Sequence, residues 1–312
     1  MRLHPDDQRV LDLIKASGRP PLNTLSPEEA RVASAASRTV LQPDPPEVAE
    51  LRDLDGGGVP LRLYRGAGTP AGAILPCLIF FHGGGWVIGD LDSHDVVCRQ
   101  IANEAGCCVI SVHYRLAPEH RFPAAVDDSA TATGWIIANA TALRIDPARI
   151  AVGGDSAGGN LAAVMALMAR DGILPPIGYQ VLVYPVTDLA AVHPSYDRIT
   201  DGYLLTATTM KWFRAHYLRD TKDEQDWRAS PLRAASLAGV APAFVLTCSH
   251  DPLCDEGRAY AERLENEGVQ VAALHMSDHM HAFLPMGRFV QASATLITSL
   301  CAALRANWSV SA

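Results

Sequence analysis

Short apolar runs that alternate with helical patterns constrain the fold of this chain more than any other feature. The runs are bounded by polar or turn-forming residues, and each is too short for a buried helix. They occupy residues 76–81, 107–112, 149–152, 179–183, 243–248 and 269–274, with helical patterns between them, for example at 127–140 and 157–170. Strands that are apolar on both faces belong to parallel sheets covered from both sides. We therefore predict an α/β protein with a mainly parallel central sheet and helices on both faces.

Two amphipathic helical patterns precede the first strand. The first covers residues 6–15. The second begins at Ser26, where Pro27 and Glu29 complete the pattern of a capping box. A proline-rich connector at 42–47 ends this region. Because amphipathic helices need a surface to cover, we expect both to pack over another part of the chain.

Residues 187–232 interrupt the alternation of strands and helices. This stretch holds a helical pattern with Met210, Phe213 and Tyr217 on one side and Trp212 beside them. The pattern suits a lid over a pocket, and the alternative is a surface helix that packs on the core. We predict cap helices at 1–46, a catalytic α/β domain at 47–186 and 236–312, and a cap insert at 187–235.

Composition excludes several classes of partner. The 312 residues are 48% hydrophobic, and their formal net charge of −8 is spread without a basic run, which argues against nucleic-acid binding. Seven cysteines stand at irregular positions, as in proteins of a reducing compartment. The N-terminus lacks the apolar core of a secretory signal, and no apolar stretch approaches membrane-spanning length. We expect a cytoplasmic protein.

Residues 152–159 read VGGDSAGG and contain the pattern G-x-S-x-G around Ser156. An apolar strand leads into the pattern and a helical segment leads out of it. A strand-to-helix elbow strains the backbone of its central residue, so the residues two positions away must be small, as Gly154 and Gly158 are. We predict that Ser156 is a nucleophile. The alternative is a glycine-rich turn that binds a phosphate.

Residues 82–86 read HGGGW and follow the apolar run that ends at Phe81. Successive glycines let backbone N–H groups approach a ligand closely. Such donors stabilise the oxyanion of a tetrahedral intermediate. We predict that the donors of this oxyanion hole are the amides of Gly83, Gly84 and Ala157, supported by His82, Gly85 and Asp155. His82 precedes the serine, whereas the base of an α/β-hydrolase follows it, so we assign His82 to the shape of the loop.

The acid of a triad should follow a later strand. Asp251 comes directly after the apolar run 243–248. Asp255 and Glu256 also satisfy the chain order, but they open a helical pattern, where acidic residues have an ordinary capping role. We therefore predict Asp251 as the acid.

The base should follow the last core strand, where the sequence reads LHMSDHMHAF. His275 stands at the expected strand end, and we expect it to pack there. Spacing does not distinguish His279 from His281. A zinc site is not predicted, because no HExxH helix is present and the neighbouring carboxylates do not suit one.

Seven motifs together give the chain a family resemblance. They are HGGGW (82–86), HYRLAPEH (113–120), FPAAVDD (122–128), GDSAGG (154–159), YP (184–185), DPLCDEG (251–257) and HAF (281–283). The chain resembles the hormone-sensitive-lipase-like (family IV) bacterial esterases of the α/β-hydrolase superfamily over nearly its whole length. The resemblance implies that Asp251 and His281, rather than their rivals, complete the triad with Ser156.

The resemblance also implies a function. It implies hydrolysis of short-to-medium acyl esters without metal or other cofactor, a small-molecule ester as the partner, a helical cap, and a homodimer. Cys254 stands where the family often has Arg, and Ala282 where it often has Gly. Two alternatives are a lipase for longer acyl chains and a non-catalytic small-molecule receptor on the same scaffold. Receptors of this kind have lost the catalytic histidine, whereas His281 is present.

Overall fold

Eight strands form one sheet in the computed structural model, which describes residues 2–310. The strand order is β1-β2-β4-β3-β5-β6-β7-β8. Strand β2 pairs antiparallel with both β1 and β4. All other neighbouring strands pair parallel, so the predicted mainly parallel sheet is confirmed. The bounds are β1 Val48–Asp55, β2 Pro60–Gly66, β3 Leu75–Phe81, β4 Cys108–Val112, β5 Ile145–Asp155, β6 Tyr179–Val183, β7 Ala243–His250 and β8 Val271–Met280.

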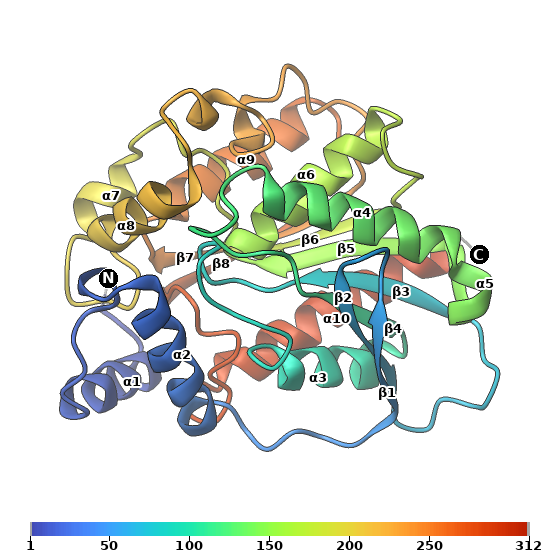
Figure 1. Ribbon diagram of the computed structural model, residues 1–312, viewed down its shortest axis with the longest axis horizontal. Coiled ribbons are helices and arrows are strands. Elements are labelled where there is room, and N and C mark those ends of the chain that lie inside the picture. Colours follow the sequence, from blue (N-terminus) through green and yellow to red (C-terminus); the bar gives the residue numbers. More distant parts are fainter. Residues whose placement is uncertain (1, 311–312) are drawn as a thin grey trace.

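Helices cover both faces of the sheet, as Figure 1 shows. The helices α4, α6 and α9 lie on one face, and α3 and α10 lie on the other. The helices α1, α2, α7 and α8 gather beside the sheet, at the left of the view. The bounds of the α-helices are α1 Pro5–Ala16, α2 Pro27–Leu41, α3 Asp95–Ala105, α4 Ala124–Ala138, α5 Ala140–Leu143, α6 Ala157–Arg170, α7 Pro194–Arg198, α8 Ala207–Tyr217, α9 Cys254–Asn266 and α10 Ala292–Val310.

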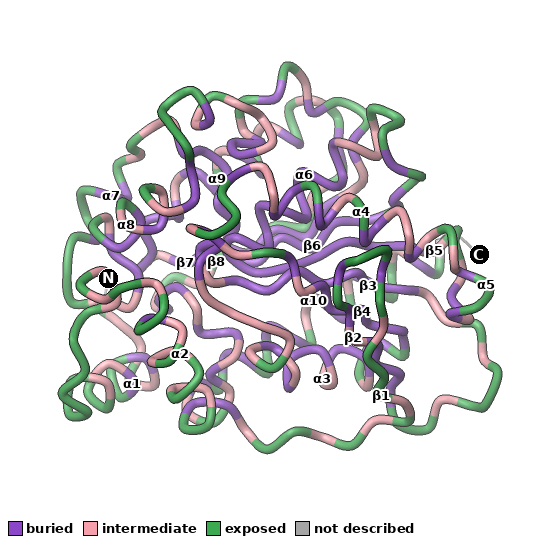
Figure 2. The backbone as a smooth tube through the Cα atoms, viewed as in Figure 1, coloured by how far each residue is buried: buried purple, intermediate pink, exposed green. Residues whose placement is uncertain are grey.

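The central strands are buried on both faces because side chains of a strand point to alternate sides. In β3, Leu78 and Phe80 join the core beneath α3 and α10, whereas Ile79 and Phe81 join the core beneath α4 and α6. All four are at most 2% exposed. Figure 2 shows the strands at the centre buried and the outer loops exposed. The uninterrupted apolar runs of the sequence reflect this double burial.

The N-terminal helices lie where the amphipathic patterns place them. The capping box of α2 is confirmed: the Glu29 amide donates to Ser26 Oγ at 3.2 Å, and the Ser26 amide donates to Glu29 Oε2 at 2.8 Å. Arg31 of α2 donates to the carbonyls of Val87 and Ala117, both at 2.9 Å. The helix is thereby fixed against the loop that follows β3.

The interrupting region 187–235 contains α7, α8 and two short 3-10 turns. In α8, Met210, Phe213 and Tyr217 are all buried, as their spacing indicates. The Tyr217 ring stacks on Trp86 with the ring centroids 4.0 Å apart. This helix therefore packs on the glycine loop that follows β3.

Two strands extend well beyond the apolar runs that predicted them. Strand β5 begins at Ile145, because the chain is already extended before its apolar run. Strand β8 continues to Met280, so His275 lies within the strand and not at its end. Its ring contacts Thr247 Oγ1 and Ser249 Oγ, each at 2.9 Å. Within residues 2–310, no helix is long and apolar enough to cross a bilayer.

Candidate active site

Ser156 occupies a sharp turn between β5 and α6. Its φ of 56° and ψ of −117° lie outside the regions that side-chain-bearing residues favour. The Ser156 amide donates to the Val183 carbonyl at 2.9 Å, and its carbonyl accepts from Asn160 at 3.0 Å. The turn is thus fixed from the neighbouring strand and from the first turn of the helix, which holds the hydroxyl at the carboxyl end of the sheet.

The glycines on either side make this turn possible. A side chain on Gly158 would collide with the carbonyl of Phe81, and one on Gly154 would meet the same carbonyl and the backbone of Gly158. The backbone of β3 therefore approaches the elbow so closely that only glycine fits at either position.

The structure brings Ser156, His281 and Asp251 together. His281 Nε2 lies 2.9 Å from Ser156 Oγ, and His281 Nδ1 lies 2.7 Å from Asp251 Oδ2. Asp251 is fully buried, His281 is 4% exposed and Ser156 is 8% exposed. With a proton on Nδ1 directed to the carboxylate, Nε2 is free to accept the hydroxyl proton of the serine.

The rival acids lie elsewhere. Asp255 pairs with Arg198 of α7 at 2.9 Å. Glu256 is buried, and its carboxyl accepts from the amides of Thr187 and Asp188 at 2.7 and 3.2 Å. Neither carboxyl contacts a histidine of the LHMSDHMHAF segment. Glu256 instead ties the segment after β6 to the helix that follows Asp251.

The rival bases also lie apart from the serine. His279 is buried, and its Nδ1 lies 3.1 Å from Asp7 Oδ2. His275 faces β7 through its contacts with Thr247 and Ser249. Asp7 belongs to no recognisable motif, so no local pattern indicates that it contacts a histidine more than 270 positions away.

The glycine loop lies beside Ser156, but Gly83 is not a free donor. Its amide donates to Asp155 Oδ1 at 2.8 Å, so the prediction that it binds an oxyanion is wrong. No hydrogen bond within residues 2–310 occupies the amides of Gly84, Gly85 or Ala157. Gly84 and Gly85 have φ of 121° and 57°, which only glycine adopts readily. The free donors are therefore one position later than expected.

A buried network holds this loop. His82 Nδ1 lies 2.8 Å from the Gly83 carbonyl, and burial together with the nearby His94 lowers the pKa of His82 to about 4. His94 Nε2 lies 2.9 Å from Asp155 Oδ1. Burial alone would raise the pKa of Asp155, but His94 and the Gly83 amide hold it below its usual range. His94 was missed because nothing in its local sequence marks it.

The departures from the family pattern have different surroundings. Ala282 has a φ of 67°, a left-handed conformation that explains why glycine suits this position. Cys254 is 3% exposed and begins α9, where burial raises the pKa of its thiol to about 11. Its thiol is thus held neutral and is not an activated nucleophile.

A cavity of ≈ 1120 Å³ opens over the serine. Its floor includes Gly84, Gly85, Ser156 and His281. Its walls come from α1, α2 and the segment 200–213, and the apolar wall residues include Leu11, Ile14, Leu22, Leu41, Leu205 and Phe213. The N-terminal helices and the insert thus enclose space directly above Ser156.

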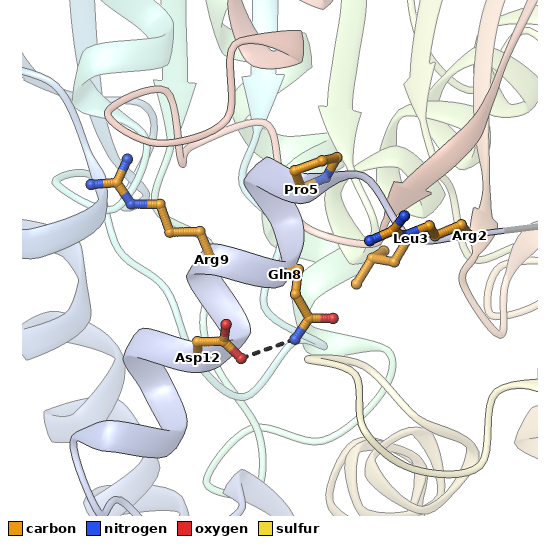
Figure 3. A pocket seen from close by; sticks show the side chains of 6 residues that line it. All are labelled: Arg2, Leu3, Pro5, Gln8, Arg9 and Asp12. Carbon is orange, nitrogen blue, oxygen red and sulfur yellow. Dashed lines mark hydrogen bonds between the residues drawn. The ribbon is translucent and has the colours of Figure 1, made fainter.

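A second hollow, of ≈ 300 Å³, lies on α1 and the segment before it (Figure 3). Its lining side chains are Arg2, Leu3, Pro5, Gln8, Arg9 and Asp12. Gln8 Nε2 donates to Asp12 Oδ1 there at 2.9 Å. None of the predicted site residues lines it.

Within residues 2–310, one group of side chains has donor types and spacing that metals use. It consists of His4, Asp278 and His279, with ligand atoms within 4.8 Å of one another. The two rings are stacked with centroids 4.5 Å apart, and His4 Nδ1 accepts from the Asp6 amide. Stacked rings do not direct their lone pairs at one point, so this arrangement does not fit an ion without reorientation.

The sheet order, the strained serine elbow and its histidine and aspartate define a protein of the α/β-hydrolase class. The model of a family with the alpha/beta hydrolase fold matches residues 78–285. The chain belongs to this family and to its hormone-sensitive-lipase-like branch, so the predicted resemblance is confirmed.

Two curated relatives align over most of the chain. An ethyl acetate hydrolase of Pseudomonas putida is 40% identical over 303 residues, which cover 93% of this chain and 95% of the relative. The carboxylic ester hydrolase LipN of Mycobacterium tuberculosis is 40% identical and covers 98% of this chain and 84% of its own length.

Solved structures agree with the fold. An ester hydrolase from the metagenome of Lake Arreo, in complex with a derivative of bipyridine phosphonate, is 41% identical with a TM-score of 0.94. It covers 98% of this chain and 99% of its own. A thermostable esterase from Pseudomonas putida has a TM-score of 0.92 at 34% identity, covering 98% of each chain.

The buried Glu256 gives stability a predicted pH dependence. Burial raises the pKa of Glu256 from 4.5 to about 8. The folded state therefore holds a proton that the unfolded state releases, so this stability is full below about pH 4.5 and is lost by about pH 8. Glu256→Gln should lose less free energy of unfolding than wild type between about pH 5 and pH 8. Urea titrations across this range measure the difference, and parallel pH profiles for the two proteins would contradict it.

Proposed function

We propose that the protein hydrolyses short-to-medium acyl esters with Ser156 as nucleophile, His281 as general base and Asp251 as the acid of the triad. The broader class, carboxylic ester hydrolase, follows from the family and agrees with its full-length relatives. One observation carries the assignment of residues: the continuous contacts from Ser156 Oγ through the His281 ring to Asp251.

The reaction begins when His281 Nε2 takes the proton of Ser156 Oγ and the oxygen attacks the ester carbonyl. Asp251 holds the ring in the required tautomer and stabilises the imidazolium. His281 then protonates the departing alcohol, which leaves an acyl group on Ser156. Water, deprotonated by the same histidine, releases the carboxylic acid and restores the serine. In this sequence of steps, protons and the acyl group pass between the substrate, the side chains of the triad and a water.

The oxyanion of each tetrahedral intermediate is assigned to the amides of Gly84, Gly85 and Ala157. Two observations support this assignment: within residues 2–310 these amides have no hydrogen-bond partner, and they lie near Ser156. The Gly83 amide, in contrast, donates to Asp155. Asp155 and His94 then act on the loop's conformation and not on the substrate. Loss of one such donor raises a barrier by roughly 3–4 kcal/mol, so the loop's shape matters to the rate.

The helices α1 and α2 with the insert at 187–235 act as a cap in this proposal. This role is supported by their position, since they supply the apolar walls of the cavity above Ser156. The name of the ethyl acetate hydrolase relative favours short esters as substrates. A cytoplasmic location stays a prediction, based on seven cysteines that are all free thiols.

A homodimer through the edge of β8 that precedes its contacts with His4 and Asp7 belongs to the same proposal. Among residues 2–310, strand β8 is the last of the sheet and has β7 as its one partner strand. An unpaired edge can accept a second strand from another copy. Sedimentation velocity should give the mass of two chains at micromolar concentration, and monomer alone at every concentration would contradict the dimer.

Replacement of Ser156 by alanine should abolish ester hydrolysis. We expect kcat/KM for a p-nitrophenyl ester to fall by at least about 10⁴-fold, because the nucleophile and its base act as a unit. Stopped-flow and steady-state release of p-nitrophenol measure the change. Ser129→Ala is the matched control, since Ser129 is also buried but donates only to the Ala125 carbonyl of its own helix.

Acyl-chain length distinguishes the proposal from its alternatives. The wild-type rate should be highest with short or medium chains. A maximum at long chains, with a sharp rise above the solubility limit, would favour a lipase. Full activity in Ser156→Ala would contradict the mechanism. A folded wild type without turnover across the series would favour the receptor.

A further inference from the structure

Helix α1 contacts the end of β8 immediately before His281. We propose that Asp7 of this helix is a positioning residue that holds His281 in register with Ser156. The inference rests on the proposed function, because it assigns His281 as the base. It gives the N-terminal helix a part in the rate of the reaction, in addition to its place in the cavity wall.

Asp7 reaches β8 through a single carboxyl oxygen. Asp7 Oδ2 accepts from the Met280 amide at 2.8 Å and lies 3.1 Å from His279 Nδ1. The Asp7 side chain is fully buried. Met280 is the residue directly before His281, so Asp7 fixes the backbone one residue before the base. We name Asp7, His279 and the Met280 amide the α1 latch.

The end of β8 needs such a contact because it lies at the edge of the sheet. Strand β8 pairs with β7, where Met280 is opposite His250. On its other side, no strand of the described residues 2–310 lies next to it. The Asp7 carboxylate supplies the acceptor for the Met280 amide at the last residue of β8, two positions before Ala282 with its left-handed φ. His281 is thus placed from both sides.

Burial of a carboxylate where a helix packs on a strand is energetically unfavourable. One oxygen of Asp7, Oδ1, is buried without a hydrogen-bond partner. A whole buried ion pair is often replaceable by apolar residues at no loss of stability, whereas loss of one partner alone is destabilising. Burial alone would lower the pKa of His279, but Asp7 and Asp278 raise it above its usual value and favour a cation beside the carboxylate. The hydrogen bonds of Asp7 depend on direction and therefore orient the end of β8, whereas an apolar contact would not.

Further contacts hold the same segment. The His4 amide donates to the Asp278 carbonyl at 2.7 Å, and the His4 ring stacks on His279. Asp6, in the same turn of α1, accepts from the Gln291 amide at 3.1 Å and does not bond to β8. Asp6 therefore provides a matched control for loss of a charge and a helix contact away from His281.

The test compares Asp7→Ala, Asp7→Leu and Asp7→Asn with Asp6→Ala, Ser156→Ala and wild type. Leucine refills the space, so Asp7→Leu serves if Asp7→Ala does not fold. Asparagine keeps an oxygen that can accept from the Met280 amide. Steady-state kcat and KM are measured with p-nitrophenyl butyrate, at a temperature where circular dichroism finds every compared variant folded.

Asp7→Ala and Asp7→Leu should lower kcat by about tenfold or more and leave KM within about twofold, because a misplaced base slows the chemistry and not the binding. Asp7→Asn should stay within about threefold of wild type, and Asp6→Ala should match wild type. This combination supports the latch. A purely structural role would lower the fraction of folded protein and leave kcat per folded molecule unchanged.

Four outcomes would overturn the inference. They are a wild-type kcat in Asp7→Leu, a rise of KM with kcat unchanged, an equal loss in Asp6→Ala, and an equal loss in Asp7→Asn and Asp7→Leu. If wild type turns over in a Ser156-dependent manner while the Asp7 variants are unaffected, only the latch fails. If wild-type turnover persists in Ser156→Ala, or is absent, the proposed function fails and the latch with it.

Discussion

The backbone of Ser156 and the strand beside it constrain the rest of the site. A left-handed residue other than glycine is unfavourable by roughly 1–2 kcal/mol, so the fold has to hold it in place. It does so by bringing the Phe81 carbonyl against Gly154 and Gly158. Phe81 is also paired with Gly154 in the parallel register of β3 and β5. One close contact thus fixes the elbow and, because the glycine loop follows Phe81, the position of the proposed oxyanion donors.

Parallel strands gather the remaining groups. The carboxyl ends of β3, β5, β7 and β8 meet at one edge of the sheet, so Gly84, Ser156, Asp251 and His281 converge from distant parts of the chain. Three of these strands have neighbours on both sides. The fourth, β8, is an edge strand, and helix α1 compensates through the Met280 amide. The site therefore depends on both ends of the sequence.

The sequence predicted the structure correctly at positions where few residue types are chemically possible. Continuous apolar runs between helical patterns predicted the sheet, and predicted bounds such as Tyr179–Val183 and Ala157–Arg170 agree with the structure. The small residues around Ser156 predicted the elbow. The residues themselves left His279 and His281 undecided, since both follow the last apolar run of the sequence, and only the family resemblance chose between them.

Other features depended on geometry that no local pattern encodes. The amide of Gly83 is indistinguishable in sequence from those of Gly84 and Gly85, and its direction follows from where Asp155 lies. Strand β8 extends beyond its apolar run because its polar residues lie at an exposed edge. Asp7 and His94 form contacts with residues far away in the chain, so each looks like an ordinary surface residue until the fold is known.

The central claim, that His281 activates Ser156 as the nucleophile, is tested most directly with a p-nitrophenyl phosphonate ester. Such a reagent forms a stable bond with an activated serine and mimics the tetrahedral intermediate. Mass spectrometry of the digested protein should find a single adduct on the peptide that contains Ser156, formed far more slowly in His281→Ala. An adduct on another residue of an active enzyme, or equal labelling of Ser156 without His281, would contradict the account.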